Sequence, residues 1–452
     1  MADAATQAAP AAPEGVTAAL NAEVVERLSD GEPAWLAERR AHAWEVYERT
    51  PLPSTRLEEW RYTDLKKKLE LGRLTLPDTA RAPDDPKTWP PRLREAMEED
   101  KEAAGHLVLI DGHVVHADLD PSLAKKGVLL SSLHEAVEKH AAEVREHLAV
   151  TVPAEEGKLA ALNAALWADG VFLHVPRGVR LDLPIRVTRW LSESGAAYFS
   201  RVLIVAERES QVSYVDEILS DDFDRQTLAS SAVEVVARDA AQVQYVAVQR
   251  LGEKGFYQSV QRTLAGRDAT LDTLNVGLGG SVSRVDLNAR LLGPGANSDM
   301  LGLYFGDGSQ HFDFNTSQDH ITPNTSSDLL YKGALDGASR AVFRGIIRVH
   351  PGAQKTDAYQ KNRNLLLSPK ARADSLPNLE IQADDVKCSH GATVGELDEE
   401  AKFYLMSRGL GRIQAERLVV LGFLGEVLSR LPLGGVSEKV TRVIEEKLAQ
   451  HG

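Results

Sequence analysis

The only cysteine of the chain lies where residue types and spacing suggest chemistry most directly. Cys388 and His390 stand two positions apart in a run that is predicted to be extended before Gly391. Because side chains alternate between faces along a strand, both can project the same way. A metal ion or an iron–sulfur cluster normally takes about four ligands, so a thiolate and an imidazole make only half of a site. A second protein would have to supply the rest. The alternative is structural, because a lone cysteine often packs as a small hydrophobe.

A second group of polar residues lies in the stretch 310–320. His311 and Asp313 share a face if this stretch is a strand. With His320 they would form a site of two histidines and one carboxylate, a set that can bind a metal ion. The alternative is that these side chains make structural hydrogen bonds or a subunit contact.

The elements that position both groups are predicted from an internal repeat. An apolar run, a turn and a second alternating run recur at 203–214, 235–245 and 263–274, with degenerate copies at 291–297, 348–354 and 380–386. Strand-and-turn units at this spacing predict a solenoid of stacked coils. We expect a mainly β protein with a right-handed parallel β-helix core over residues 155–395. A β-sandwich is the alternative. The equivalent turn positions, about 30 residues apart with one gap of double length, are Glu209, Asp239, Asp268, Gly295, Gly352 and Asp385.

Helical segments are predicted on both sides of this core. Residues 1–13, rich in alanine and proline, predict a disordered tail. Residues 14–154 predict a mostly helical domain that contains a proline-rich linker from Pro77 to Pro91 and a small hairpin turning at Asp111-Gly112. Residues 396–452 predict a C-terminal helical domain, with Asp398 capping its first helix. We expect the flanking helices to cover the two ends of the solenoid.

Two apolar stripes are predicted on the later C-terminal helices. They contain Leu418, Leu421, Gly422, Gly425 and Leu428, followed by Val440, Val443, Ile444 and Leu448.

The repeat also predicts the direction of the candidate ligands. Aligning Asp385 with Asp239 places Cys388 opposite Gln242 and His390 opposite Gln244, which are polar positions. This alignment predicts that the pair projects outward. The same alignment turns Lys387 inward, which predicts an irregular last coil.

Composition excludes several classes of function. The chain of 452 residues has a net charge of -14, which disfavours binding to nucleic acid or to an anionic membrane surface. No apolar run approaches the length of a membrane span, and the N-terminus lacks the pattern of a secretory signal, so we expect a cytoplasmic protein. No phosphate-binding loop and no nucleophile elbow occur, which disfavours P-loop ATP hydrolysis and serine hydrolase chemistry.

Seven motifs together resemble one family, the SufB/SufD family of the SUF iron–sulfur cluster assembly system. They are Trp60-Arg-Tyr-Thr-Asp64, Pro323-Asn-Thr-Ser-Ser-Asp-Leu-Leu-Tyr-Lys-Gly333, Phe343-Arg-Gly345, Val349-His-Pro-Gly-Ala-Gln-Lys-Thr-Asp-Ala358, Asn362-Arg-Asn-Leu-Leu-Leu-Ser368, Pro377-Asn-Leu-Glu-Ile381 and Cys388-Ser-His-Gly-Ala-Thr-Val-Gly395. A single cysteine favours the SufD branch, because SufB members usually carry several.

The resemblance implies a non-enzymatic scaffold subunit that pairs with SufB and with the ATPase SufC. His390 matches the SufD histidine that contributes to a transient iron–sulfur cluster shared with SufB, and Cys388 matches the same motif in second place. The isolated chain is expected to hold no stable cluster. We also consider a homodimer of the chain when its partners are absent. The SufC contact is expected at the C-terminal helices, with Leu418, Leu421, Leu428, Val440, Ile444 and Leu448. The alternative is a carbohydrate-active β-helix enzyme.

Overall fold

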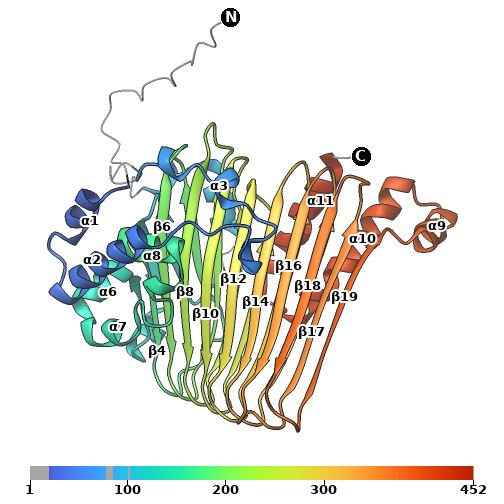
Figure 1. Ribbon diagram of the computed structural model, residues 1–452. Coiled ribbons are helices and arrows are strands. Elements are labelled where there is room, and N and C mark those ends of the chain that lie inside the picture. Colours follow the sequence, from blue (N-terminus) through green and yellow to red (C-terminus); the bar gives the residue numbers. More distant parts are fainter. Residues whose placement is uncertain (1–19, 78–84, 100–101, 451–452) are drawn as a thin grey trace, which may run out of the picture.

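The computed structural model describes residues 20–77, 85–99 and 102–450, and its body is a solenoid of two facing β-sheets (Figure 1). The nine-stranded sheet contains β3 (Leu129–Ser132), β4 (Asp169–Val175), β6 (Ala197–Ala206), β8 (Thr227–Ala237), β10 (Gly255–Ala265), β12 (Val282–Leu291), β14 (His311–His320), β16 (Arg340–Val349) and β18 (Arg372–Ile381). The ten-stranded sheet contains β1 (Gly105–Ile110), β2 (His113–Leu119), β5 (Ile185–Leu191), β7 (Gln211–Ser220), β9 (Gln242–Arg250), β11 (Thr270–Gly277), β13 (Asn297–Gly306), β15 (Ser326–Leu335), β17 (Asp357–Leu366) and β19 (Lys387–Glu396).

From β4 to β19 the chain alternates between the two sheets, and every pair formed among these strands is parallel. Each coil therefore adds one strand to each sheet, as a solenoid requires. The predicted mainly β solenoid is confirmed, and a sandwich with Greek-key crossings is excluded.

The turns explain the period that the sequence shows. Glu209, Asp268 and Gly295 occupy the left-handed region, with φ of 63°, 54° and 80°. Asn324, with φ of 59°, does the same in the coil whose copy is unrecognisable in the sequence. Asparagine tolerates this conformation. In two other coils the left-handed residue is Ala240 or Lys355, so the predicted turn positions Asp239 and Gly352 are one and three residues away from it.

The N-terminal region closes the first end of the solenoid. The hairpin of β1 and β2 turns at Asp111-Gly112 as predicted, β1 joins β5, and β3 pairs with β4 in antiparallel register. Helices gather at this end (Figure 1). The helices are α1 (Ala22–Ser29), α2 (Ala34–Arg49), α3 (Leu65–Lys68), α4 (Pro91–Glu99), α5 (Pro121–Lys125), α6 (Leu133–Lys139), α7 (Ala141–His147) and α8 (Lys158–Leu166), with short 3-10 turns at Glu58–Trp60, Leu71–Arg73, Pro86–Thr88 and Ala154–Glu156. The predicted tail at 1–13 lies outside the described residues.

Part of the proline-rich stretch is folded rather than extended. Pro86 and Pro91 stand at the first positions of a 3-10 turn and of α4, where a missing N–H costs nothing. Trp89 and Leu93 are buried against the solenoid beside Trp190. The described half of this stretch therefore packs as a small helical unit.

The C-terminal helices are α9 (Glu399–Ser407), α10 (Arg412–Arg430) and α11 (Val436–Gln450). As predicted, the side chain of Asp398 caps α9. The expectation that these helices cover the terminal edge is wrong: α10 and α11 pack on the outer face of the ten-stranded sheet, whereas α9 projects past β19 (Figure 1). The outer face of that sheet carries valines and leucines, and α10 and α11 remove them from water.

The phase of the first C-terminal stripe differs from the prediction. The side of α10 that meets the sheet carries Val420, Leu424, Val427 and Leu428. On the predicted stripe Leu418 is exposed and Leu421 is only partly buried. Val440 and Ile444 of α11 are buried, as their spacing predicts.

Among the described helices, none is both long and apolar enough to cross a membrane.

Candidate functional site

At the C-terminal end of the solenoid, each sheet ends on an edge strand that has a neighbouring described strand on one side only. β19 pairs with β17 on one side and β18 with β16, and no described strand lies beyond either of them. A strand edge of this kind presents N–H and C=O groups that can pair with another chain. This end of the solenoid is open, in contrast to the first end.

The strand register places both candidate ligands on the inner face of the last coil. Cys388 continues the row of Val212, Val243, Leu271, Ser298, Ser327 and Ala358. His390 continues the row of Tyr214, Tyr245, Thr273, Met300, Leu329 and Gln360. The prediction that they project outward is wrong, because Lys387 and not Cys388 continues the row of Gln242. The chain enters β19 one residue sooner after Asp385 than the alignment assumed, and such a slip exchanges the two faces of a strand. Lys387 and Ser389 face outward.

Cys388 is half-buried at the rim of the open end. It packs against a small apolar cluster that contains Ile347, Val349 and Ala358. Burial, followed by the nearby Asp357 carboxylate, raises the pKa of the thiol. The free thiol therefore stays protonated at neutral pH, and a bound cation would be needed to hold it as a thiolate.

His390 is exposed although it faces inward, because no further coil covers it. The same holds for three apolar side chains of the last coil, Leu379, Ile381 and Val394, which point into the solenoid and yet are exposed. In earlier coils the equivalent positions are buried. The open end therefore exposes a slice of the core with the thiol and the imidazole set into it.

Cys388 and His390 can supply two ligands from one face. In the described part of the chain no group of three or more His, Cys, Asp or Glu side chains could hold a metal ion. Since a cluster takes about four ligands, the arrangement suits a shared site and not a self-contained one.

The second candidate group does not form a site. His311 and Asp313 face outward on β14, whereas His320 faces inward, where its ring nitrogens lie 2.8 Å from Thr325 Oγ1 and 2.8 Å from Ser327 Oγ. Burial lowers the pKa of His320 to about 4, so its ring is neutral. The spacing misled because nine residues separate His311 from His320, an odd number that places them on opposite faces.

His311 and Asp313 instead fasten the N-terminal segment to the outer face of the nine-stranded sheet. Thr63 Oγ1 lies 2.8 Å from His311 Nε2 and also donates to Asp313, which in turn pairs with Arg284. The Arg284 guanidinium lies 3.7 Å from the Trp60 ring centroid. Burial, helped by nearby cations, lowers the pKa of His311 to about 3. The motif Trp60-Arg-Tyr-Thr-Asp64 therefore has a structural role, because it attaches the N-terminal segment to the nine-stranded sheet.

The predicted docking residues of the C-terminal helices are mostly used inside the molecule. Leu428, Val440 and Ile444 are buried against the ten-stranded sheet, and Leu421 and Leu448 are partly buried. A different apolar surface is exposed on α9 and the start of α10. This α9–α10 surface contains Phe403, which is 72% exposed, with Tyr404, Met406, Ile413 and Leu418.

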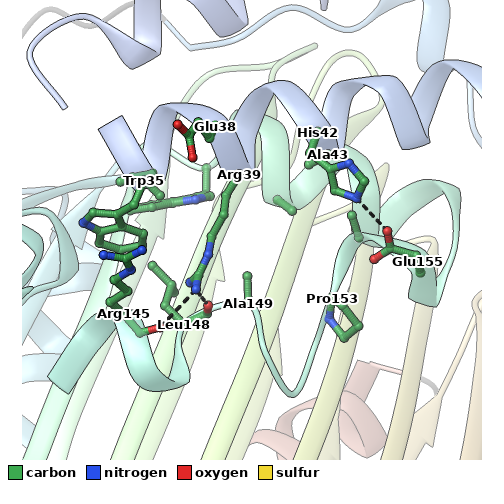
Figure 2. A pocket seen from close by; sticks show the side chains of 14 residues that line it. Trp35, Glu38, Arg39, His42, Ala43, Arg145, Leu148, Ala149, Pro153 and Glu155 are labelled. Atoms are coloured by element: carbon green, nitrogen blue, oxygen red, sulfur yellow. Dashed lines mark hydrogen bonds and ion pairs between the residues drawn. The ribbon is translucent and has the colours of Figure 1, made fainter. Parts of the chain in front are cut away.

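A cavity of about 300 Å³ lies at the other end of the molecule, between α2 and the segment around α7 (Figure 2). Two of its polar side chains are already paired within the protein. Arg39 donates to the carbonyls of Leu148 (2.5 Å) and Arg145 (3.0 Å), and His42 Nε2 lies 2.7 Å from Glu155 Oε1, as Figure 2 shows. Because these pairs hold α2 in place, we assign the cavity to helix packing.

Comparison with known proteins gives the same family over both halves of the chain. The family described as "SUF system FeS cluster assembly, SufBD core domain" matches residues 189–423, and the "SufBD protein N-terminal region" matches residues 17–187.

Individual relatives agree with this. The chain is 34% identical over 426 residues to the "Iron-sulfur cluster assembly protein SufD" of Bacillus subtilis, covering 92% of this chain and 95% of that protein. It is 27% identical over 404 residues to an "Iron-sulfur cluster assembly SufBD family protein" of Staphylococcus epidermidis, covering 89% and 87%. A Staphylococcus aureus protein of the same description is 26% identical over 418 residues, covering 92% and 90%.

Proposed function

Because the chain belongs to the SufB/SufD family of SUF iron–sulfur cluster assembly proteins, we propose that it is the SufD-type scaffold subunit of an assembly complex. The family membership confirms the resemblance carried by the sequence motifs and disfavours a carbohydrate-active enzyme. In this role the chain makes no covalent change itself. It presents ligands and surfaces to a SufB-type partner and to the ATPase SufC.

The open end of the solenoid is the observation that carries the proposal. β18 and β19 leave their outer edges unpaired, and the exposed core slice contains Leu379, Ile381 and Val394. A partner built of similar coils can pair with these edges and cover the slice in one step, which buries apolar surface and satisfies backbone groups together. With no such partner, a second copy of the chain can occupy the same end as a homodimer.

A partner at this end would complete the ligand set. Cys388 and His390 offer one sulfur and one nitrogen toward the joint, and two further ligands from the partner would make a full coordination sphere for iron. The nascent cluster is cargo of the complex: it forms between the subunits and leaves for other proteins. The isolated chain accordingly holds no stable cluster.

The ATPase contact fits the α9–α10 surface better than the predicted stripes. Phe403, Tyr404 and Leu418 expose large apolar side chains, whereas most predicted stripe residues already pack on the sheet. β19 leads into α9 through Leu397 and Asp398. α9 is therefore close to β19 in the sequence and in space, and a protein bound at α9 would lie near the strand that carries His390 (Figure 1).

Co-expression of the chain with its SufB-type and SufC-type partners tests the proposal. His390→Ala should leave the yield of the complex nearly unchanged, since an exposed imidazole packs little, but should reduce iron and acid-labile sulfide at least tenfold. Cys388→Ala should reduce them less, because part of its role is packing. His311→Ala should lower the melting temperature and leave the iron per assembled complex unchanged.

His134→Ala is the matched control, because His134 is an exposed histidine on α6, at the opposite end of the solenoid. Normal iron and sulfide in the His390→Ala complex would remove this residue, and with it the proposed site.

A further inference from the structure

Gln360 is the buried side chain directly beneath His390. The two residues are register partners on β17 and β19, one strand spacing of about 4.8 Å apart, and both face the interior of the solenoid. Gln360 is completely buried, whereas His390 above it is exposed. Any group that orients the imidazole from below must therefore come from this position or from the facing sheet.

The side-chain amide of Gln360 makes one hydrogen bond across the interior of the solenoid, and its oxygen remains without a partner among the described residues. Its Nε2 donates to the Gly345 carbonyl at 3.4 Å, which fixes Oε1 as the remaining acceptor. The two residues are closely packed, because a Cβ on Gly345 would lie 2.4 Å from that oxygen. Within the described part of the chain Oε1 has no hydrogen-bond partner, although it is buried. A buried acceptor without a donor is unusual and costly.

The next layer of the solenoid offers one side-chain donor in this row. Gly345 is followed on the facing sheet by Pro377, which has no backbone N–H to donate, and Gln360 is followed by His390. We propose that Gln360 is a positioning residue: its Oε1 accepts a hydrogen bond from one ring N–H of His390. The other ring nitrogen is then left with its lone pair directed at the partner subunit, where it can bind iron. This inference rests on the function proposed above.

Gln360→Met removes the acceptor and keeps the length and the apolar stem of the side chain. Gln318→Met is the matched control, because Gln318 is also completely buried and its Oε1 also has no partner. Gln318 lies on β14, away from the last coil, and its Nε2 donates to Ser327 and to the Tyr359 carbonyl. The control therefore loses at least as many hydrogen bonds.

The first readout is the tautomer of His390 in the isolated chain, seen by nitrogen-15 NMR of histidine-labelled protein at mildly alkaline pH, with His390→Ala used to assign its signal. The wild type and the Gln318→Met variant should show one locked tautomer. Gln360→Met should show an average of both tautomers, and Gln360→Glu, which keeps an acceptor, should restore the locked form. A wild-type spectrum that already averages both tautomers would overturn the proposal. This measurement uses the wild type alone, so it decides the matter even if Gln360→Met does not fold.

The second readout is iron and acid-labile sulfide in the co-expressed complex. Gln360→Met should lower both by about tenfold or more, at unchanged complex yield, whereas Gln318→Met should leave them unchanged per assembled complex. If His390→Ala abolishes the cluster and Gln360→Met does not, the positioning role is wrong and the proposed function stands. If His390→Ala has no effect, the proposed function fails first.

Discussion

Cys388 and His390 lie two residues apart on one face of β19, but they differ in burial and in packing. The thiol packs against Ile347 and Val349 and has a raised pKa, so it needs a cation nearby before it can act as a ligand. The imidazole is exposed, so little buried packing depends on it. Loss of His390 should therefore be felt in the chemistry, and loss of Cys388 in chemistry and packing together.

A pH-dependent contribution to stability is expected at Asp272, on the outer face of β11. Burial raises the pKa of this carboxyl from 3.8 to about 6. The folded state then holds the proton more tightly than the unfolded state, so the group destabilises the fold as pH rises from about 4 to about 6, and fully above that.

Asp272→Asn should remove this penalty, since the amide can still accept from the Asp299 N–H at 2.9 Å. We expect about 1 kcal/mol more stability at neutral pH and no gain below about pH 4, because partial exposure reduces the full value of the pKa shift. Urea midpoints measured across this pH range check it. A gain that persists in acid would show that some other effect of the substitution is responsible.

Among the elements, α11 is attached to the solenoid by a buried charge. Lys439 Nζ lies 2.7 Å from Glu217 Oε2, and Arg250 holds the other oxygen of the same carboxylate. Burial acts against the ionised form of Glu217, but Lys439 and Arg250 outweigh it and lower its pKa. The charges therefore stay ionised inside the interface between helix and sheet.

Removing one partner of such a pair should loosen the helix. Lys439→Met should cost about 3 kcal/mol of stability and expose α11 to proteolysis. Arg442→Met is the control: Arg442 pairs with Glu99 at the same distance of 2.7 Å but is half-exposed, and should cost less than about 1 kcal/mol. Equal losses of melting temperature in the two variants would contradict the assignment of the buried pair as the attachment.

The α9–α10 surface should bind the ATPase. Phe403→Ser together with Leu418→Ser should weaken SufC binding at least tenfold, because both side chains are exposed and apolar, and should leave the fold unchanged. Leu57→Ser, at a leucine that is equally exposed on the N-terminal segment, is the control. Titration of SufC against each variant checks this, and unchanged affinity would place the contact elsewhere.

These elements also show how far the sequence alone leads. The repeated turns predict the solenoid, because its period is local and each coil repeats the same chemistry. The direction of Cys388 and His390 is not predicted, since an error of one residue in aligning the last turn exchanges the faces of β19. Gln360 has no local signal at all. Its role depends on Gly345 and His390, which become its neighbours only when the coils stack.

At the scale of the whole molecule the two ends of the solenoid differ. The first end is closed by β1–β3 and by the N-terminal helices, whereas the second exposes two strand edges and a slice of core. α10 and α11 do not close the second end, because they lie on the outer face of the ten-stranded sheet. One closed and one open end agree with the proposed complex, in which one further solenoid adds at the open end and the two chains share one site.

We propose that the SufB-type partner joins the chain at this open end. Amide hydrogen exchange of the full chain, measured alone and in complex, tests this contact. We predict that the amides of β18 and β19 become protected in the complex while β4 and β5 at the closed end do not change. Unchanged exchange in β18 and β19, with new protection on another surface, would contradict the account.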